Sequence, residues 1–254
     1  MNEMKAHKSA PGTLQRYAWF ALLAATIWLI LLPVGYWASR VCLVVASAAL
    51  WIGGTFLLRR RRALALAVFI TGLTVVGWLC VPGRAGDPDV LRQSYVRCLI
   101  KYEGTRYVWG GENRLGIDCS GLVRKGLILA NIKTGARTLN PRLVRAGLDL
   151  WWHDCTAKAL RDEYRAYTMR LKQAQSINDI PPESVLPGDL AITSDGSHVL
   201  AYLGGKTWIE ADPNEMKVII VEIPSDNMWF NTPVHLVRWS QLLEPSGQNR
   251  SDNL

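Results

Sequence analysis

The sequence predicts an α+β domain with an antiparallel sheet, preceded by an all-α membrane region of three helices. Two observations carry this prediction. Three long charge-free runs stand in a row near the N-terminus, and helix-periodic segments are later followed by a series of short strands. The chain has 254 residues, and from about residue 84 its composition is that of an ordinary soluble domain, long enough to bury a core.

The N-terminal part is predicted to form three membrane spans. Each charge-free run is close to the ~20 residues that a helix needs to cross the hydrocarbon core. Charges at the centre of a span cost roughly 2.5–3.5 kcal/mol each, and between Tyr17 and Val81 they occur only at Arg40 and Arg59–Arg62. We therefore expect a membrane region at 17–83 after a basic tail at 1–16. The predicted spans are 17–37, 41–58 and 63–81.

The positive charges predict the direction of these spans. Lys5, Lys8 and Arg16 precede the first span, and Arg59–Arg62 joins the second to the third. The positive-inside rule places both groups in the cytoplasm, so the domain after Pro82 emerges on the extracytoplasmic side of the plasma membrane. Although the formal net charge is +8, these charges flank apolar segments. That placement favours a lipid bilayer as partner and argues against nucleic acid.

The remaining residues predict helices first and strands after them. The predicted domain covers 84–245, with a polar tail at 246–254, and its first helix covers Asp87 to Tyr102. A glycine-rich loop or short strand pair is expected at 107–117, and a second helical region at 143–174 within a long helical insert at about 135–180. The predicted strands are 189–193, 198–203, 206–211, 217–222 and 235–239.

Cys119 is the candidate nucleophile. Asp118 before it is a good N-cap, which places Cys119 in the first turn of a helix. A helix N-terminus lowers a thiol pKa and offers outward-pointing N–H groups to an oxyanion. On composition alone, a small buried cysteine is the plainer interpretation. The five cysteines contain no CxxC pair, so no metal site is predicted, although Cys98 and Cys155 could pair in an oxidising exterior.

His198 is the candidate base, because it starts a strand directly after the turn at Ser194–Ser197. Two acids on the next strand could orient its ring. With a three-residue turn at Gly204–Lys206, His198 lies opposite Asp212 and diagonal to Glu210, whereas an even turn points both acids to the other face. The residues alone leave Glu210 and Asp212 as rivals.

The sequence resembles the NlpC/P60 cysteine peptidases. Four segments carry the resemblance in the same order, from Val90 to Trp239. They are Tyr107-Val-Trp-Gly-Gly, Gly116-Ile-Asp-Cys-Ser-Gly-Leu-Val, Leu186-Pro-Gly-Asp-Leu and His198-Val-Leu-Ala-Tyr-Leu-Gly. The resemblance implies a papain-like fold, no cofactor, and cleavage of amide bonds in peptidoglycan stem peptides at a bacterial membrane.

The resemblance also implies roles for single residues. The family's third polar position corresponds to Glu210, which selects it over Asp212 and gives a triad of Cys119, His198 and Glu210. The thiolate attacks, His198 shuttles the proton, and water hydrolyses an acyl-enzyme. Tyr107, Asp118 and Ser120 match positions that bind substrate or support the oxyanion.

Two features depart from the family pattern. The insert at 135–180 is longer than usual and offers a surface to cover the groove or to bind a membrane protein partner. The membrane spans stand where relatives usually carry a signal peptide and a wall-binding module. Two alternatives stay open: an acyltransferase or amidase acting on lipids or proteins, and a non-catalytic domain that binds wall fragments or acts as a scaffold.

Overall fold

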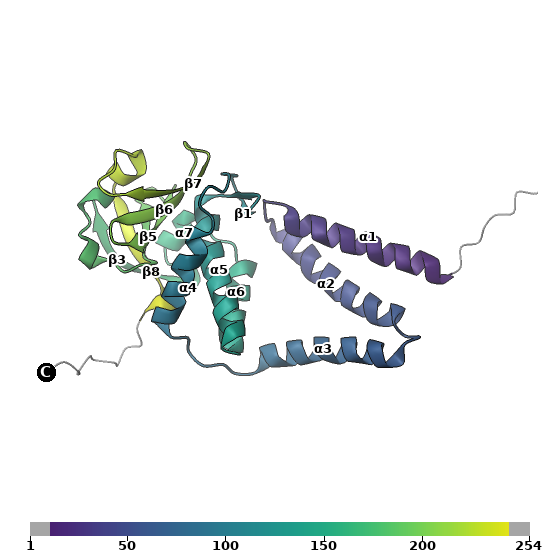
Figure 1. The fold of residues 1–254 in the computed structure, drawn as a ribbon. Helices are drawn as coiled ribbons and strands as arrows, with labels where there is room; N and C mark the ends of the chain where they lie inside the picture. Colours follow the sequence, from purple (N-terminus) through teal and green to yellow (C-terminus); the bar gives the residue numbers. More distant parts are fainter. Residues whose placement is uncertain (1–10, 244–254) are drawn as a thin grey trace, which may run out of the picture.

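A computed structural model of the protein describes residues 11–243 (Figure 1). Three long apolar helices come first, and an α+β domain with an antiparallel sheet follows, so the predicted fold class is confirmed. Most of the predicted basic tail, up to residue 10, and the polar tail at 246–254 lie outside the described residues.

Three helices are long and apolar enough to cross a membrane. They are α1 (Pro11–Leu31), α2 (Trp37–Leu57) and α3 (Arg62–Cys80). Their apolar side chains are largely exposed, as expected for surfaces that face lipid. Helix α2 contacts both neighbours: the Trp19 indole of α1 donates to the Leu50 carbonyl over 3.0 Å, and the rings of Trp51 and Phe69 stack at 5.6 Å.

The observed spans differ from the predicted ones at both ends of the first connection. Helix α1 ends at Leu31 rather than at residue 37, because Pro33 has no backbone N–H and disfavours helical geometry before it. Helix α2 begins at Trp37 rather than at residue 41, and so includes Arg40. That arginine is buried and pairs with Glu112 of the following domain.

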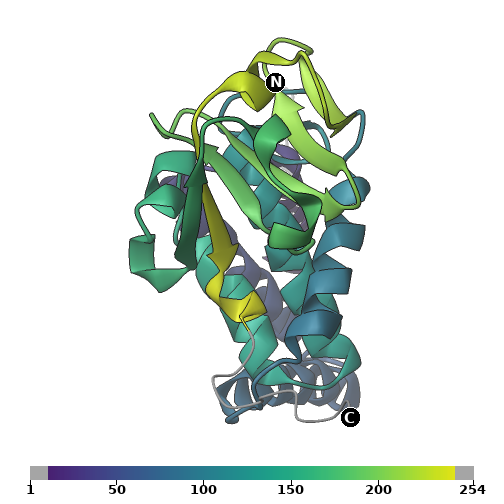
Figure 2. The ribbon, with the colours of Figure 1, turned by 90° about the vertical axis from the view of Figure 1, so that its left-hand side faces the viewer.

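The second part is a six-stranded antiparallel sheet covered on one face by helices. Helices α4 (Pro88–Ile100) and α5 (Cys119–Arg137) lie between the sheet and the helices α1 to α3, which extend away from the domain (Figures 1 and 2). The strand order is β3-β8-β4-β5-β6-β7. The strands are β3 (Thr168–Ala174), β4 (Leu190–Thr193), β5 (Val199–Gly204), β6 (Thr207–Asp212), β7 (Lys217–Glu222) and β8 (Val234–Trp239).

The core forms where the apolar side of α5 meets the sheet. Leu122 and Leu127 of α5 are buried with Val199 and Ile209 of the strands. A second buried cluster, which includes Trp208 and Phe230, covers the other face of the sheet. The short strands β1 (Glu112–Asn113) and β2 (Gly116–Ile117) pair ahead of α5, which confirms the short strand pair expected in the glycine-rich segment.

The insert at 135–180 is only partly helical. Helix α5 continues to Arg137, and α6 (Pro141–Trp152) and α7 (Ala157–Arg161) follow it. The end of the predicted helical region, Thr168–Ala174, is instead the edge strand β3, paired with β8. Arg170 and Lys172 suggested an exposed helix, but charged side chains also protect an edge strand, and pairing with β8 overrides local propensity. Short 3-10 turns occur at Tyr164–Ala166, Ile177–Asp179, Pro182–Ser184, Met228–Asn231 and Ser240–Leu242.

The Leu186-Pro-Gly-Asp segment starts the sheet. Asp189 is completely buried and accepts two hydrogen bonds from the Arg238 guanidinium, at 2.6 and 2.7 Å. Its carboxylate also accepts from the Leu186 N–H at 2.8 Å. Gly188 has a φ of +93°, a conformation open to glycine at little cost. The buried ion pair therefore joins β4 to β8 at a fixed register.

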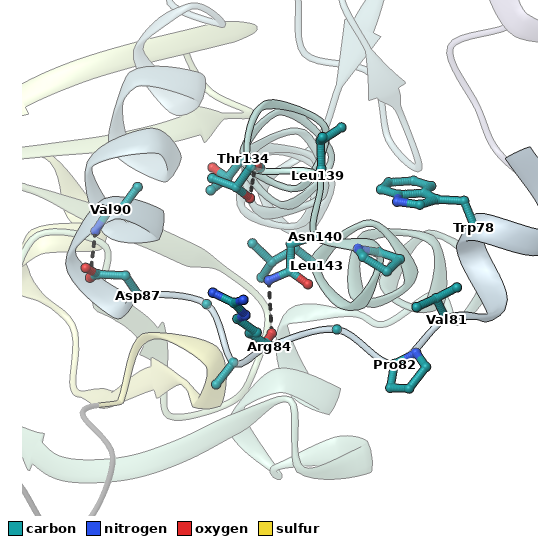
Figure 3. A pocket seen from close by; sticks show the side chains of 15 residues that line it. Trp78, Val81, Pro82, Arg84, Asp87, Val90, Thr134, Leu139, Asn140 and Leu143 are labelled. Atoms are coloured by element: carbon teal, nitrogen blue, oxygen red, sulfur yellow. Dashed lines mark hydrogen bonds between the residues drawn. The ribbon is translucent and has the colours of Figure 1, made fainter.

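The segment that follows α3 is also held by the domain (Figure 3). Arg145 of α6 donates to the carbonyls of Leu79 and Val81, the latter over 2.7 Å. Asn140 donates to the Arg84 carbonyl over 2.9 Å, and Asp87 caps α4. A cavity of about 480 Å³ lies between this segment and the helices. It contains none of the candidate catalytic residues.

Candidate active site

Cys119 is the first residue of α5, and the Asp118 side chain fixes this helix end. One carboxylate oxygen of Asp118 accepts from the Gly121 N–H at 2.5 Å and the Ser120 hydroxyl at 3.0 Å. The other accepts from the Gly110 N–H at 2.8 Å. The predicted N-cap is confirmed. Since first-turn N–H groups lack intrahelical acceptors, the Cys119 thiol lies at the positive end of a helix dipole.

Gly121 allows this helix end to touch the glycine-rich loop. A Cβ atom at residue 121 would lie 2.1 Å from the Gly111 carbonyl oxygen, well inside van der Waals contact. The Asp118 N–H donates to that same carbonyl at 3.2 Å. The glycine in the Gly-x-Asp-Cys-Ser-Gly motif therefore lets the backbone of the first turn of α5 contact the backbone of the loop at Gly111. This contact sets the position of Cys119 relative to the loop.

His198 and Glu210 form a buried pair on the neighbouring sheet. His198 directly precedes β5, and its Nε2 lies 2.6 Å from Oε2 of Glu210 on β6. The Trp229 ring stacks on the imidazole, with centroids 4.1 Å apart and planes at 20°. Because Nε2 is engaged by Glu210, Nδ1 is the ring nitrogen left for the Cys119 side.

The strand register explains how Glu210 reaches this ring. Ala201 pairs with Ile209 and Tyr202 with Trp208, and a bulge at Leu203 shifts the register before Gly204 pairs with Thr207. Continuing the register past Ala201 puts His198 opposite Asp212 and diagonal to Glu210. This is the predicted parity, reached through a bulge and a short turn rather than through a three-residue turn.

Charge and burial shape the proton affinity of this pair. Burial of His198 disfavours its charged form, but the interactions with Cys119 and Glu210 outweigh burial and raise its pKa to about 9. Burial raises the pKa of Glu210, and the facing imidazole opposes that effect. Since the ring faces two acidic groups, we expect an imidazolium to persist at neutral pH.

Asp212 takes a different position from Glu210. Its carboxylate accepts from the Asn214 N–H at 2.7 Å and from the Asn227 side chain at 3.0 Å. The same Asn227 amide donates to Oε1 of Glu210 at 3.1 Å, and its own oxygen accepts from the Trp229 N–H. Sequence reasoning missed Asn227 and Trp229. Both lie in a loop without a motif, where no sequence pattern indicates which side chains turn back to the sheet.

A groove of about 640 Å³ holds both Cys119 and His198. Tyr107, Asp118 and Ser120, the predicted substrate or oxyanion positions, line the same groove. Burial raises the pKa of Tyr107, and the acidic groups of Cys119, Asp118 and Asp212 raise it further, so the phenol stays protonated and can donate a hydrogen bond. Glu112, Arg124 and Asp154 also line this groove.

The other candidate side chains lie outside this arrangement. All five cysteines are free thiols. Cys98 and Cys155 are therefore not paired. Cys98 lies near the Lys133 amine, and burial raises the pKa of Cys155 to about 11. Within residues 11–243, no group of three or more His, Cys, Asp or Glu side chains is arranged to hold a metal ion.

The family comparison covers more than half of the chain. Residues 104–238 match the NlpC/P60 family, over a segment that includes Cys119, His198 and Glu210. The chain belongs to the NlpC/P60 family. NlpC/P60 proteins are cysteine peptidases that include peptidoglycan hydrolases, so the enzyme class predicted from the motifs is confirmed.

Solved structures similar to this NlpC/P60 chain come from distant organisms. NlpC1 from Trichomonas vaginalis is 18% identical, with a TM-score of 0.39, over 58% of this chain and 43% of that one. NlpC2 from the same organism is 19% identical, with a TM-score of 0.39, over 64% and 50%. The peptidoglycan hydrolase RipB from Mycobacterium tuberculosis is 22% identical, with a TM-score of 0.39, over 70% and 78%.

This chain therefore spans about half or less of the two Trichomonas proteins. No curated protein matches the sequence.

The raised pKa of His198 predicts a pH-dependent stability. The folded-state pKa of about 9 exceeds the usual value of 6.5, so protonation stabilises the fold below pH 6.5, and this contribution is lost as pH rises through 9. The contribution of His198 protonation to the free energy of unfolding is on the order of 3 kcal/mol. Urea unfolding at pH 6 and pH 9.5 measures it. His198→Gln should lose this drop in stability and Glu210→Gln should reduce it. A wild-type drop retained in full by His198→Gln would contradict the assignment.

Proposed function

We propose that the protein is a membrane-anchored cysteine hydrolase that cleaves an amide bond in peptidoglycan stem peptides. The observation that carries this proposal is the arrangement of three side chains. Cys119, at a helix N-terminus, and His198 line one groove, and Nε2 of His198 lies 2.6 Å from the buried Glu210 carboxylate. Membership of the NlpC/P60 family supports peptidoglycan as the substrate class. We assign the catalytic domain to residues 84–245, after a membrane region at 17–83.

The proposed reaction proceeds through an acyl-enzyme. The Cys119 thiolate attacks the scissile carbonyl carbon, a C–S bond forms, and the oxygen becomes an oxyanion near the free N–H of the first helical turn. The imidazolium of His198 donates its proton to the leaving amine as the C–N bond breaks. Neutral His198 then takes a proton from water, which attacks the thioester. Collapse releases the carboxylic acid and restores the thiolate and the imidazolium.

The surrounding residues have supporting roles in this proposal. Glu210 holds the imidazole orientation and stabilises its positive charge. Asn227 bridges Glu210 and Asp212 through a single amide, so Asp212 supports the third member without contacting the ring. Tyr107 offers a protonated hydroxyl to the substrate, while Asp118 and Ser120 keep the Cys119 turn in place.

The nucleophile is tested by substitution of Cys119. Cys119→Ala should lower hydrolysis of purified muropeptides by at least about 10³-fold, because the thiol that attacks the carbonyl and receives the acyl group is missing. Cys80→Ala, which changes an exposed cysteine at the end of a membrane span, should keep wild-type activity. Mass spectrometry of the products, with lipid amides as a parallel substrate, measures both. Full activity in Cys119→Ala, or turnover of lipid amides alone, would contradict the proposal.

We also infer that the catalytic domain lies on the extracytoplasmic side of a bacterial inner (plasma) membrane. The segment between α1 and α2 contacts the catalytic domain, so both lie on one side: the Pro33 carbonyl accepts from the Glu112 N–H at 2.8 Å. The run Arg59–Arg62 is at the opposite end of α2 and α3, away from the domain (Figure 1). Arginines at that end favour the cytoplasm, which supports an N-terminus inside and the domain outside.

A reporter fusion tests this topology. Alkaline phosphatase, which folds only in an oxidising exterior, is fused after residue 84 and should be active, while a fusion after Arg60 should be inactive. A cytoplasmic reporter at the same two positions should give the reverse pattern. An inactive phosphatase at residue 84 would exclude mature cell wall as the substrate.

A further inference from the structure

The connection between the first two membrane helices lies against the glycine-rich loop that lines the groove. Residues 32–36 lie against the glycine-rich loop, where Val34 forms an antiparallel bridge with Gly111. The Glu112 N–H donates to the Pro33 carbonyl, and the Asn113 amide donates to the Leu32 carbonyl over 2.6 Å. The loop that carries Glu112 thus contacts the start of α5 on one side and the connection between α1 and α2 on the other.

Arg40 extends this contact into the groove wall. It lies on α2, its side chain is 3% exposed, and it pairs with Glu112 and lies 3.7 Å from an Asp154 carboxylate oxygen. It also donates to the Trp152 carbonyl over 3.4 Å. The residues come from three separate places: a membrane helix, the glycine-rich loop and the end of the insert helix α6.

Arg124 of α5 shares the same two acids. It lies 3.1 Å from Glu112 and pairs with Asp154, so two buried arginines face two carboxylates. Glu112, Arg124 and Asp154 all line the groove that contains Cys119, whereas Arg40 lies behind them. Without Arg40, Glu112 and Asp154 would lose one of the two arginines that they share.

Membrane insertion alone does not explain this position of Arg40. An arginine near the end of a span can extend its charged head to water or headgroups at small cost. Arg40 instead turns into the protein, where its guanidinium is nearly inaccessible and contacts residues of the catalytic domain. Its burial therefore depends on the catalytic domain being docked on the membrane helices.

We propose that Arg40 is a positioning residue of the active site, and that the membrane region completes the substrate groove by holding the Glu112–Asp154 wall. This inference rests on the proposed hydrolase function. It also gives the insert a role: the end of α6 supplies Asp154 and the Trp152 carbonyl, which the anchor holds in place. Loss of Arg40 should loosen substrate binding and leave the chemistry at Cys119 unchanged.

The molecule offers a matched control at its second attachment point. Arg145 also joins the membrane region to the catalytic domain, through the carbonyls of Leu79 and Val81, but it does not line the groove. Arg145→Gln therefore loosens the anchor without touching the wall. Arg40→Lys keeps the positive charge but loses the planar fork that contacts several groups at once.

The test uses the full chain in lipid nanodiscs with purified muropeptides. Arg40→Gln should raise KM by about tenfold or more, with kcat and its pH profile within about twofold of wild type. Arg40→Lys, which keeps the charge, should recover part of the loss, and Arg145→Gln should keep the wild-type KM. An unchanged KM in Arg40→Gln, or an equal rise in Arg145→Gln, would overturn the inference.

Hydrogen exchange provides a readout that does not need turnover. Arg40→Gln should accelerate amide exchange at Glu112 and in residues 152–157, while α4, α5 and the labelling of Cys119 by iodoacetamide stay as in wild type. If Arg40→Gln loses protection throughout the protein, it is unfolded, and the same comparison of exchange rates is made with Arg40→Lys. Unchanged exchange at both segments would overturn the inference, even if muropeptides proved not to be the substrate. If the wild-type protein does not hydrolyse muropeptides, that result contradicts the proposed function and leaves the inference about Arg40 to the exchange measurement.

Discussion

The Asp118 carboxylate is the contact on which the rest of the site depends. Its two oxygens bind the Gly110 N–H on one side and the first turn of α5 on the other, so a single side chain joins the glycine-rich loop to the helix that carries Cys119. The loop in turn pairs with the connection between the first two membrane helices. Through Asp118, the position of the thiol is therefore linked both to the helix dipole and to the membrane anchor.

The other half of the site is set by the sheet. His198 precedes β5 and Glu210 lies within β6, so their separation is a consequence of strand register, and a one-residue slip would turn Glu210 to the opposite face. The Trp229 ring packs on the imidazole, and Asn227 fixes Glu210 and Asp212 together. A helix N-terminus and the start of an inner strand thus carry the proposed nucleophile and the proposed base, and the core packs these two elements against each other.

Local patterns were sufficient for several of these features. The cap at Asp118 and the strand that follows His198 follow from sequence periodicity and turn residues. The residues alone left Glu210 and Asp212 as rivals, and the family resemblance selected Glu210. The features that were not predictable depend on tertiary contacts. The segment Thr168–Ala174 is a strand because β8 is available to pair with it. Arg40, in the first turn of α2, is buried because it pairs with Glu112, 72 residues away in the chain. Neither partner is visible from local sequence.

In the proposed mechanism, the acyl group is transferred to the Cys119 thiol. Trapping of the acyl-enzyme tests this transfer most directly. Wild-type protein mixed with excess muropeptide and quenched in acid within milliseconds should give an intact mass increased by the acyl portion of the stem peptide. Peptide mapping should place this addition on Cys119, and Glu210→Gln should change the rate at which it accumulates. Hydrolysis that proceeds with no covalent addition at any time point, or with the addition on another residue, would contradict the account.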